Sequence, residues 1–170
     1  MNETDHASST LTERPLATPV LRQLMAAVNH HDASRVAALH SQDYEGLDVS
    51  RAQLRQGRDA VQEDYADWFQ AFPDLRLTVT EVMVQPNRVT VSWTREGTHQ
   101  GPFLHVPPTG QHITVCGMSV LTLKRARLTR GLHLWDMAGL LRAMKLLPEL
   151  PQAAYNTSRT LLLSTFLQRA

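Results

Sequence analysis

The spacing of apolar residues changes at Leu75, and this change most limits the folds open to the chain. Before Leu75, apolar residues recur at helical spacing, which predicts helices beginning at Pro19, after Asp32 and at about Arg58, the last ending at Phe72. After it, apolar and polar residues alternate, which predicts four strands: 75–84 with a bulge near Thr80, 89–97, 113–123 and one ending at Trp135. Helices followed by adjacent strands indicate the α+β class with a curved antiparallel sheet.

Two polar segments are predicted as loops, and the two ends of the chain are predicted to lie outside the domain. Residues 43–56 are irregular and polar, and residues 101–110 (GPFLHVPPTG) hold two prolines that do not fit a strand ladder. We predict a disordered N-terminal tail over 1–14, one domain over 15–147 and a helical extension over 148–170. The extension is amphipathic, and packing on its own domain and packing on a second subunit remain equal alternatives.

Composition excludes several classes of function. The chain has 170 residues, of which 42% are hydrophobic and 19% charged, and its formal net charge of +1 provides no field to hold nucleic acid or an anionic membrane. We find no membrane-spanning stretch and no signal-peptide pattern, so we expect a cytoplasmic protein. Cys116 is the single cysteine, which rules out an intramolecular disulfide, and its apolar strand predicts a buried thiol.

Sequence patterns for cofactor and metal sites are missing. The chain has no glycine-rich phosphate loop, no Cys-x-x-Cys and no His-Glu-x-x-His, and its eight histidines show no convincing ligand spacing. We therefore expect neither a metal nor a cofactor. The chemistry that remains is acid–base catalysis in a pocket.

The stretch 128–141 (LTRGLHLWDMAGLL) contains the carboxylate that attracts most interest. Its alternation predicts a strand whose apolar face carries Leu132, Leu134 and Asp136, and helical spacing begins at Met137. A carboxylate on a buried face is costly unless it is paired, hydrogen-bonded or protonated. Two interpretations of Asp136 follow: it caps the next helix, or it is a general base in a dry pocket.

Large apolar side chains supply the candidate walls of such a pocket. The predicted helix 58–72 carries an aromatic stripe, which is most often core but also makes a rigid cavity wall. The candidate ligand-contacting residues are Tyr65, Trp68, Phe69, Trp93, Phe103, Met118, Leu134 and Trp135.

Four motifs resemble those of a known family. AFPDL (71–75), GTHQGPF (97–103), PPTG (107–110) and DMAGLLRAM (136–144) are similar, in order and spacing, to motifs of the SnoaL-like polyketide cyclases, whose fold is shared with nuclear transport factor 2 and ketosteroid isomerase. The resemblance covers roughly residues 18–147. It implies a cone: a curved antiparallel sheet wrapped around helices, enclosing an apolar cavity. Known cyclases of this family close a ring by intramolecular aldol condensation without metal or cofactor, and the family's catalytic aspartate matches Asp136.

The combined interpretation is an enzyme that abstracts a proton next to a carbonyl on a hydrophobic small molecule. It is a polyketide cyclase or a related isomerase, with Asp136 as the base and His99 or Trp93 holding the enolate oxygen. We expect a homodimer formed through the sheet. The alternative is a non-catalytic ligand-binding or oligomerisation module on the same fold.

Overall fold

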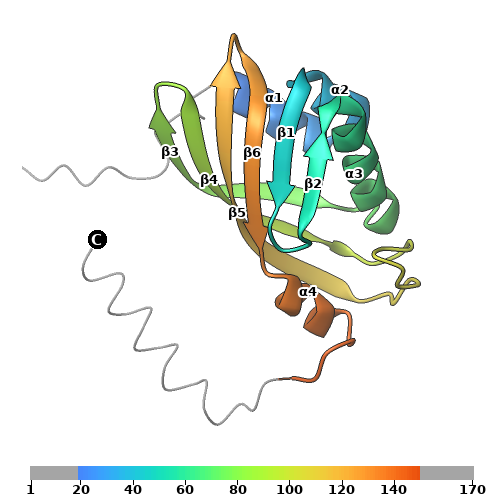
Figure 1. The fold of residues 1–170 in the computed structure, drawn as a ribbon. Coiled ribbons are helices and arrows are strands. Elements are labelled where there is room, and N and C mark those ends of the chain that lie inside the picture. The colour runs from blue at the N-terminus through green and yellow to red at the C-terminus, as the bar shows by residue number, and fades with distance from the viewer. Residues whose placement is uncertain (1–18, 150–170) are drawn as a thin grey trace, which may run out of the picture.

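The computed structural model describes residues 19–149, which form helices packed against one curved sheet (Figure 1). The helices are α1 (Pro19–Asn29), α2 (Ala33–Ala38), α3 (Gly57–Ala71) and α4 (Met137–Ala143). The strands are β1 (His40–Asp48), β2 (Gln53–Gln56), β3 (Arg76–Gln85), β4 (Arg88–Thr98), β5 (His112–Lys124) and β6 (Arg127–Trp135). The predicted α+β class is confirmed; the predicted tail 1–14 and nearly all of the extension 148–170 lie outside the described residues.

The six strands are arranged in the order β2-β1-β6-β5-β4-β3. Neighbouring strands are antiparallel except β1 and β6, which run parallel. Helix α1 packs on the edge strand β3, whereas α3 packs on β1 and the other edge strand, β2, so different helices cover the two edges of the sheet. The predicted bulge near Thr80 is confirmed, since the register of β3 against β4 shifts between Val79 and Glu81.

Local sequence explains how the helices begin and attach. The side chain of Asp32 accepts a hydrogen bond from the backbone N–H of Arg35 at 2.8 Å, which caps α2 as predicted. The side chain of Asn29, at the end of α1, exchanges two hydrogen bonds with the backbone of Leu77, at 2.8 and 3.0 Å. This pair joins α1 to β3.

The prediction of a loop over 43–56 is wrong, because most of this segment forms β1 and β2. In β1 the residues His40, Tyr44 and Asp48 point inward and are buried. These inward residues are polar or aromatic rather than aliphatic, so the alternation does not show as a hydrophobic pattern. Pairing with β6, far away in the sequence, supplies the ladder that makes β1 a strand.

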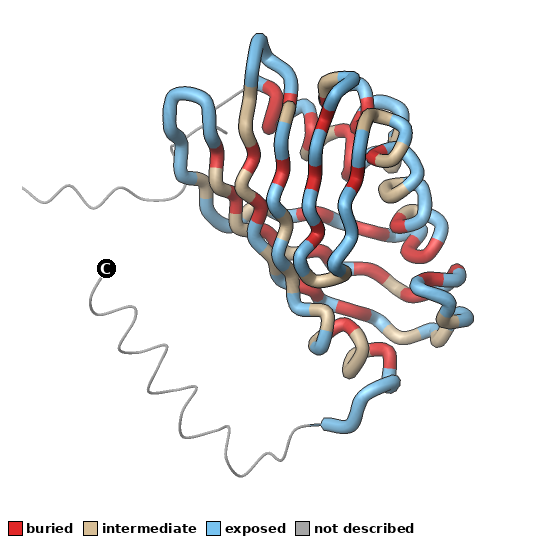
Figure 2. Tube along the Cα trace, in the orientation of Figure 1, coloured by how far each residue is buried: buried red, intermediate tan, exposed pale blue. Residues whose placement is uncertain are grey.

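The predicted faces of the last strand are reversed. Leu132 and Leu134 are 38% and 42% exposed, whereas His133 and Trp135 point inward. The thiol of Cys116, predicted to be buried, is also exposed on the neighbouring strand β5. Figure 2 shows the alternation of buried and exposed residues along the strands. A period of two separates the faces of a strand but does not say which one meets the helices.

The hydrophobic core lies between the helices and the inner face of the sheet. Its largest fully buried side chains include Trp68, Phe72, Leu75 and Ile113. Among the described residues, no helix is long and apolar enough to cross a membrane.

Candidate functional site

A cavity of about 70 Å³ lies between α1, α3 and the inner face of the sheet. Its apolar wall comes from α1 and from the strands β3, β4 and β5. Its polar wall draws on five strands and one helix: His40, Tyr44, Asp48, Arg55, Asp64, Tyr65, Trp93, Arg95, Ser119, His133 and Trp135. The site is therefore a small space between helices and sheet in which titratable side chains converge.

Two carboxylates and two guanidinium groups form a buried ion cluster at one side of this cavity. Arg51 Nε lies 3.0 Å and Arg55 Nη2 lies 3.2 Å from Oδ2 of Asp48. Arg55 Nη2 also lies 2.6 Å from Oδ1 of Asp64, to which Arg51 is paired as well. The indole N–H of Trp135 donates to both oxygens of Asp48 at 3.0 Å. The cluster thus connects β1, β2, α3 and the end of β6.

The two carboxylates of the cluster differ in how fully they are bonded. Both oxygens of Asp48 accept hydrogen bonds, including one from the backbone N–H of Arg51 at 3.1 Å. For Asp64, the hydrogen bonds from described residues reach Oδ1 only. Burial raises the pKa of Asp64, although Arg51 and Arg95 partly oppose the rise. Asp64 is therefore the carboxylate with an oxygen left for a ligand.

A chain of hydrogen bonds crosses the opposite wall of the cavity. The indole N–H of Trp93 donates to Ser119 Oγ at 2.9 Å, and Ser119 Oγ lies 2.9 Å from His133 Nδ1. His133 Nε2 lies 3.1 Å from the hydroxyl oxygen of Tyr44. Four side chains from four strands are thus joined in one line.

The donor and acceptor roles along this line of hydrogen bonds follow from the Trp93 end. The indole of Trp93 can only donate, so Ser119 accepts there. Within residues 19–149, the acceptor for the hydroxyl of Ser119 is His133 Nδ1. That assignment places the ring proton of His133 on Nε2, where it donates to the oxygen of Tyr44. The O–H of Tyr44 is then free to donate to a ligand in the cavity.

Burial keeps the titratable side chains at this wall of the cavity uncharged. It lowers the pKa of His133 to about 4, with the positive charge of Arg95 acting in the same direction. It likewise lowers the pKa of His40, whose ring meets Tyr44 edge-on at 4.5 Å, to about 4. Burial raises the pKa of Tyr44, and the charge of Asp64 adds to the rise. Tyr44 is therefore a neutral hydrogen-bond donor at physiological pH.

Gly131 creates the space that this arrangement needs. A Cβ at this position would collide with the hydroxyl of Tyr44 and the ring of His133. Any larger residue would therefore push the two side chains apart.

Arg95 is the other cation of the cavity, and it is only 9% exposed. Its guanidinium lies over three aromatic rings, with its central carbon 4.6 Å from the ring centre of Trp68, 4.8 Å from Trp93 and 5.4 Å from Tyr65. Its polar contact is a long hydrogen bond of 3.4 Å from Nη2 to the hydroxyl of Tyr65, and Nε has no partner among the described residues.

The structure brings three of the candidate ligand-contacting residues to the cavity: Tyr65, Trp93 and Trp135. Trp68 is buried against Arg95 and Trp135, and Phe103 is packed against Trp68, but neither lines the cavity. Phe69 stacks on His31 instead. Met118 and Leu134 face each other across β5 and β6 on the outer face of the sheet, and both are exposed.

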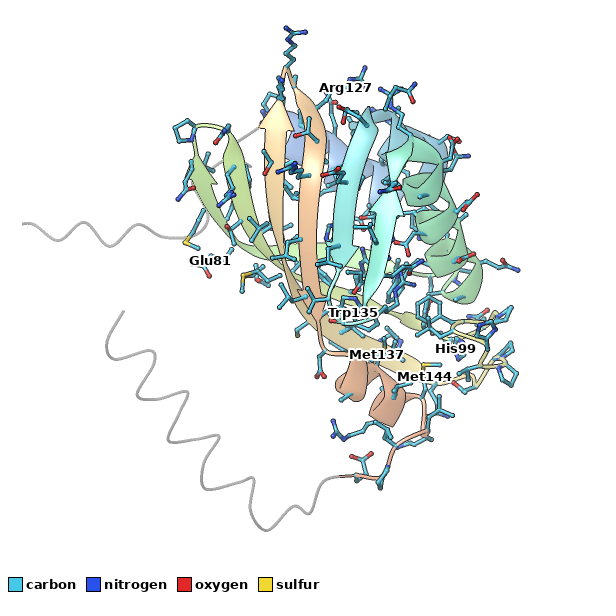
Figure 3. The ribbon with its side chains drawn as sticks, viewed as in Figure 1. Glu81, His99, Arg127, Trp135, Met137 and Met144 are labelled. Carbon is cyan, nitrogen blue, oxygen red and sulfur yellow. The ribbon has the colours of Figure 1, made fainter. Side chains whose placement is uncertain are left out.

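The structure does not bring Asp136 or His99 to the cavity. Asp136 is exposed, which differs from the buried position predicted for it, and its Oδ1 accepts from the backbone N–H of Gly139 at 2.7 Å as the N-cap of α4. His99 is buried near the loop between β4 and β5, where Nδ1 accepts from the backbone N–H of Thr109 at 3.2 Å. Figure 3 shows His99 beside this loop, and Trp135 at the end of β6 just before α4.

Sequence reasoning missed the polar residues that do line the cavity, among them Tyr44, Asp48, Asp64, Arg95 and His133. The available signal was the opposite phase of the last strand, in which His133 and Trp135 alternate with leucines. For Asp64 the signal was a carboxylate next to Tyr65 on an otherwise aromatic helix stripe. No group of three or more His, Cys, Asp or Glu side chains suited to a metal ion is found within residues 19–149.

Comparison with known proteins agrees with this architecture. A family model described as SnoaL-like polyketide cyclase matches residues 18–144. The match spans most of the chain and includes every helix and strand found within residues 19–149. The chain belongs to the SnoaL-like polyketide cyclase family.

Solved structures place this SnoaL-like chain among several bacterial proteins. AclR of Streptomyces galilaeus, a proposed hydroxylase, is 26% identical with a TM-score of 0.72, over 88% of this chain and 94% of AclR. A proposed SnoaL-like polyketide cyclase of Jannaschia sp. CCS1 is 23% identical with a TM-score of 0.68, over 76% and 91% of the two chains. IdmH of Streptomyces antibioticus, a proposed polyketide cyclase, is 19% identical with a TM-score of 0.65, over 74% and 96%. No curated protein matches.

The capping position of Asp136 in this SnoaL-like chain leads to a first prediction. Asp136→Asn should change the free energy of unfolding little, because Asn caps a helix about as well as Asp, whereas Asp136→Ala should cost about 1 kcal/mol. Urea denaturation of the two variants measures this difference. Equal losses for Asn and Ala would contradict a capping role.

A second prediction concerns His133. Its pKa is about 4 in the folded chain and 6.5 without the fold, so between these values the unfolded chain binds more protons. Its contribution to stability is therefore present above pH 6.5 and is lost as the pH falls towards 4, by roughly 3 kcal/mol. His133→Gln should remove about half of the combined effect of His133 and His40, measured by urea denaturation between pH 7 and 4.

The control for this prediction is His105→Gln, which changes an exposed side chain in the loop between β4 and β5. It should keep the pH dependence of the wild type. If His133→Gln also keeps it, His133 is not buried in its neutral form.

Proposed function

We propose that this member of the SnoaL-like family catalyses proton transfer next to a carbonyl group, as in ring closure by aldol condensation or in double-bond isomerisation, without a cofactor. The observation that carries the proposal is the pairing, in one cavity, of a carboxylate oxygen left free by its partners with a neutral hydroxyl donor. These are the two groups that enolate formation needs: a base for the carbon-bound proton and a donor for the oxygen.

Asp64 is the proposed base. Its Oδ1 is held by Arg51 and Arg55, which orients the carboxylate, and Oδ2 is the oxygen left to accept a proton. Burial raises its pKa, which makes it a stronger base than an exposed aspartate. Asp48, whose two oxygens are fully bonded, is the less suitable carboxylate.

Tyr44 is the proposed donor to the developing oxygen. The oxygen of Tyr44 accepts from His133 Nε2, which leaves the O–H of Tyr44 to donate to the substrate. The hydrogen bonds from Trp93 through Ser119 to His133 hold this arrangement in place. As negative charge forms on the substrate oxygen, this line of donors stabilises it within a site of low dielectric constant. Trp93, expected to hold that oxygen directly, acts through Ser119 and His133 instead.

The size of the cavity limits what it can hold. Its volume of about 70 Å³ is well below the roughly 300–1,000 Å³ of pockets for drug-sized ligands. A single ring fits the space more readily than a fused polycycle does. A larger ketone would require movement of lining side chains such as Met25, which is only half-buried.

Activity can be tested with simple ketones, because the proposed step exchanges a proton next to a carbonyl. In D₂O the wild type should accelerate deuterium incorporation into cyclohexanone, a single-ring ketone, measured by proton NMR. Asp64→Asn should lower this acceleration by roughly 10²–10⁴-fold through loss of the base. Tyr44→Phe should lower it by roughly 10²-fold through loss of the donor.

The matched control is Asp67→Asn, an exposed aspartate on the same helix, which should exchange protons at the wild-type rate. Circular dichroism of each variant checks that the fold is kept. Ketones that raise the melting temperature without any proton exchange would favour the alternative function, a non-catalytic ligand-binding module. Full activity in Asp64→Asn would rule out the proposed base.

We also propose that the chain forms a homodimer through the outer face of its sheet. Exposed apolar side chains gather there on β1, β2, β5 and β6: Leu47, Leu54, Met118, Leu132 and Leu134. A shallow depression on this face is edged by Glu45, Arg88 and Arg130. An apolar patch with charged residues of both signs at its edge is suited to a self-complementary contact.

The dimer predicts a change in mass after a single substitution. Leu132→Asp places a charge in the middle of the apolar patch and should convert the dimer into a monomer, measured by sedimentation velocity. Leu104→Asp, which changes an exposed leucine of the loop between β4 and β5, should leave the dimer intact. A wild-type chain that sediments as a monomer would contradict the proposal.

A further inference from the structure

The charges around the cavity do not balance. Among the described residues, the ion cluster pairs two carboxylates, Asp48 and Asp64, with two guanidinium groups, Arg51 and Arg55. Arg95 lines the same cavity and adds a third positive charge that has no ion pair within residues 19–149. The two cavity histidines are neutral, so the surplus is one positive charge.

A buried, unpaired guanidinium is costly, because it loses its hydration without a counter-charge to replace it. The aromatic faces of Trp68, Trp93 and Tyr65 recover part of this cost. They do not use its N–H donors: within residues 19–149, Nε has no partner and the one contact of Nη2 is that of 3.4 Å to the hydroxyl of Tyr65. The side chain of Arg95 is therefore held in place while N–H groups of its guanidinium remain able to donate hydrogen bonds.

We propose that Arg95 binds the carboxylate of an organic acid, so that the natural ligand of the cavity is a small carboxylic acid anion with a flat, apolar body. One negative charge balances the surplus, and a carboxylate matches the planar fork of a guanidinium. The rings around Arg95 and the apolar wall from α1 and β3 accommodate the flat body. This anion is the substrate class of the reaction proposed above. Its role as substrate rests on that proposed function, whereas its binding to Arg95 does not.

The test compares benzoate with benzamide, which have nearly the same shape and differ in charge. In chloride-free buffer at pH 7, isothermal titration of the wild type should show benzoate binding at least tenfold more tightly than benzamide. Arg95→Met keeps an unbranched apolar stem against the tryptophans and removes the charge, so it should abolish the preference. Arg95→Lys keeps the charge without the planar fork and should retain a reduced preference.

Arg76→Met is the matched control, since it removes an exposed arginine of β3 that lines neither the cavity nor the proposed dimer patch. It should keep the wild-type preference for benzoate. A purely structural Arg95 would give a lower melting temperature in Arg95→Met with no difference between the two probes in the wild type. Equal affinity of the wild type for both probes, or no binding of either, overturns the proposal even if Arg95→Met fails to fold.

The same titration separates this proposal from the proposed reaction. Asp64→Asn should lose proton exchange while still preferring benzoate, since removing a neighbouring negative charge does not weaken an anion site. A wild type that prefers benzoate but exchanges no ketone protons would leave the anion site standing and remove the enzyme. A wild type that exchanges ketone protons but shows no preference for benzoate would overturn the anion site and leave the proposed reaction standing.

Discussion

The buried ion cluster of Asp48, Asp64, Arg51 and Arg55 is the constraint on which the rest of the site depends. Charges removed from water are tolerated only when their partners are held in good geometry, and loss of a single partner from such a cluster typically costs about 3–5 kcal/mol. The four residues come from the end of β1, the turn after it, β2 and α3. Because they must meet, α3 is drawn against the short β1–β2 edge, which would otherwise have little apolar surface to hold it.

The cluster also organises the chemistry of the cavity. Its arginines bond one oxygen of Asp64 and leave the other oxygen for a ligand. Both oxygens of Asp48 are bonded, and they hold the indole of Trp135 at the end of β6. On the other wall, Trp93, Ser119, His133 and Tyr44 form a line of neutral donors. The proposed base, Asp64, and the proposed donor, Tyr44, therefore line one cavity and can reach the same small ligand.

Arg95 gives the cavity a property that the donor line alone does not have. Proton transfer to a carboxylate base needs no additional cation, and yet a third guanidinium is buried beside the cluster. Its aromatic surroundings stabilise it without using its donors. This combination distinguishes the chain from a simple apolar container and is the basis for the anionic ligand proposed above.

The sequence by itself determined the features that depend on neighbouring residues. The cap at Asp32, the helix that begins at Pro19, the bulge near Thr80 and the four motifs that lead to the SnoaL-like family all follow from local pattern. The α+β class follows as well, since the change of period at Leu75 separates helices from most of the strands.

Only the tertiary structure decided which face of each strand is inside. Alternation in β6 is the same whether His133 or Leu134 points inward, and the choice is made when β1 pairs with β6, bringing Tyr44 to His133 across 89 positions of sequence. The same pairing makes β1 a strand, although its inward residues are polar. Asp136, attractive as a base by its position in the sequence, is left exposed one residue beyond the strand, while Asp64 on α3 faces the cavity. Local sequence sets a residue's periodicity, but its burial depends on what packs against it, and here that partner is distant in the chain.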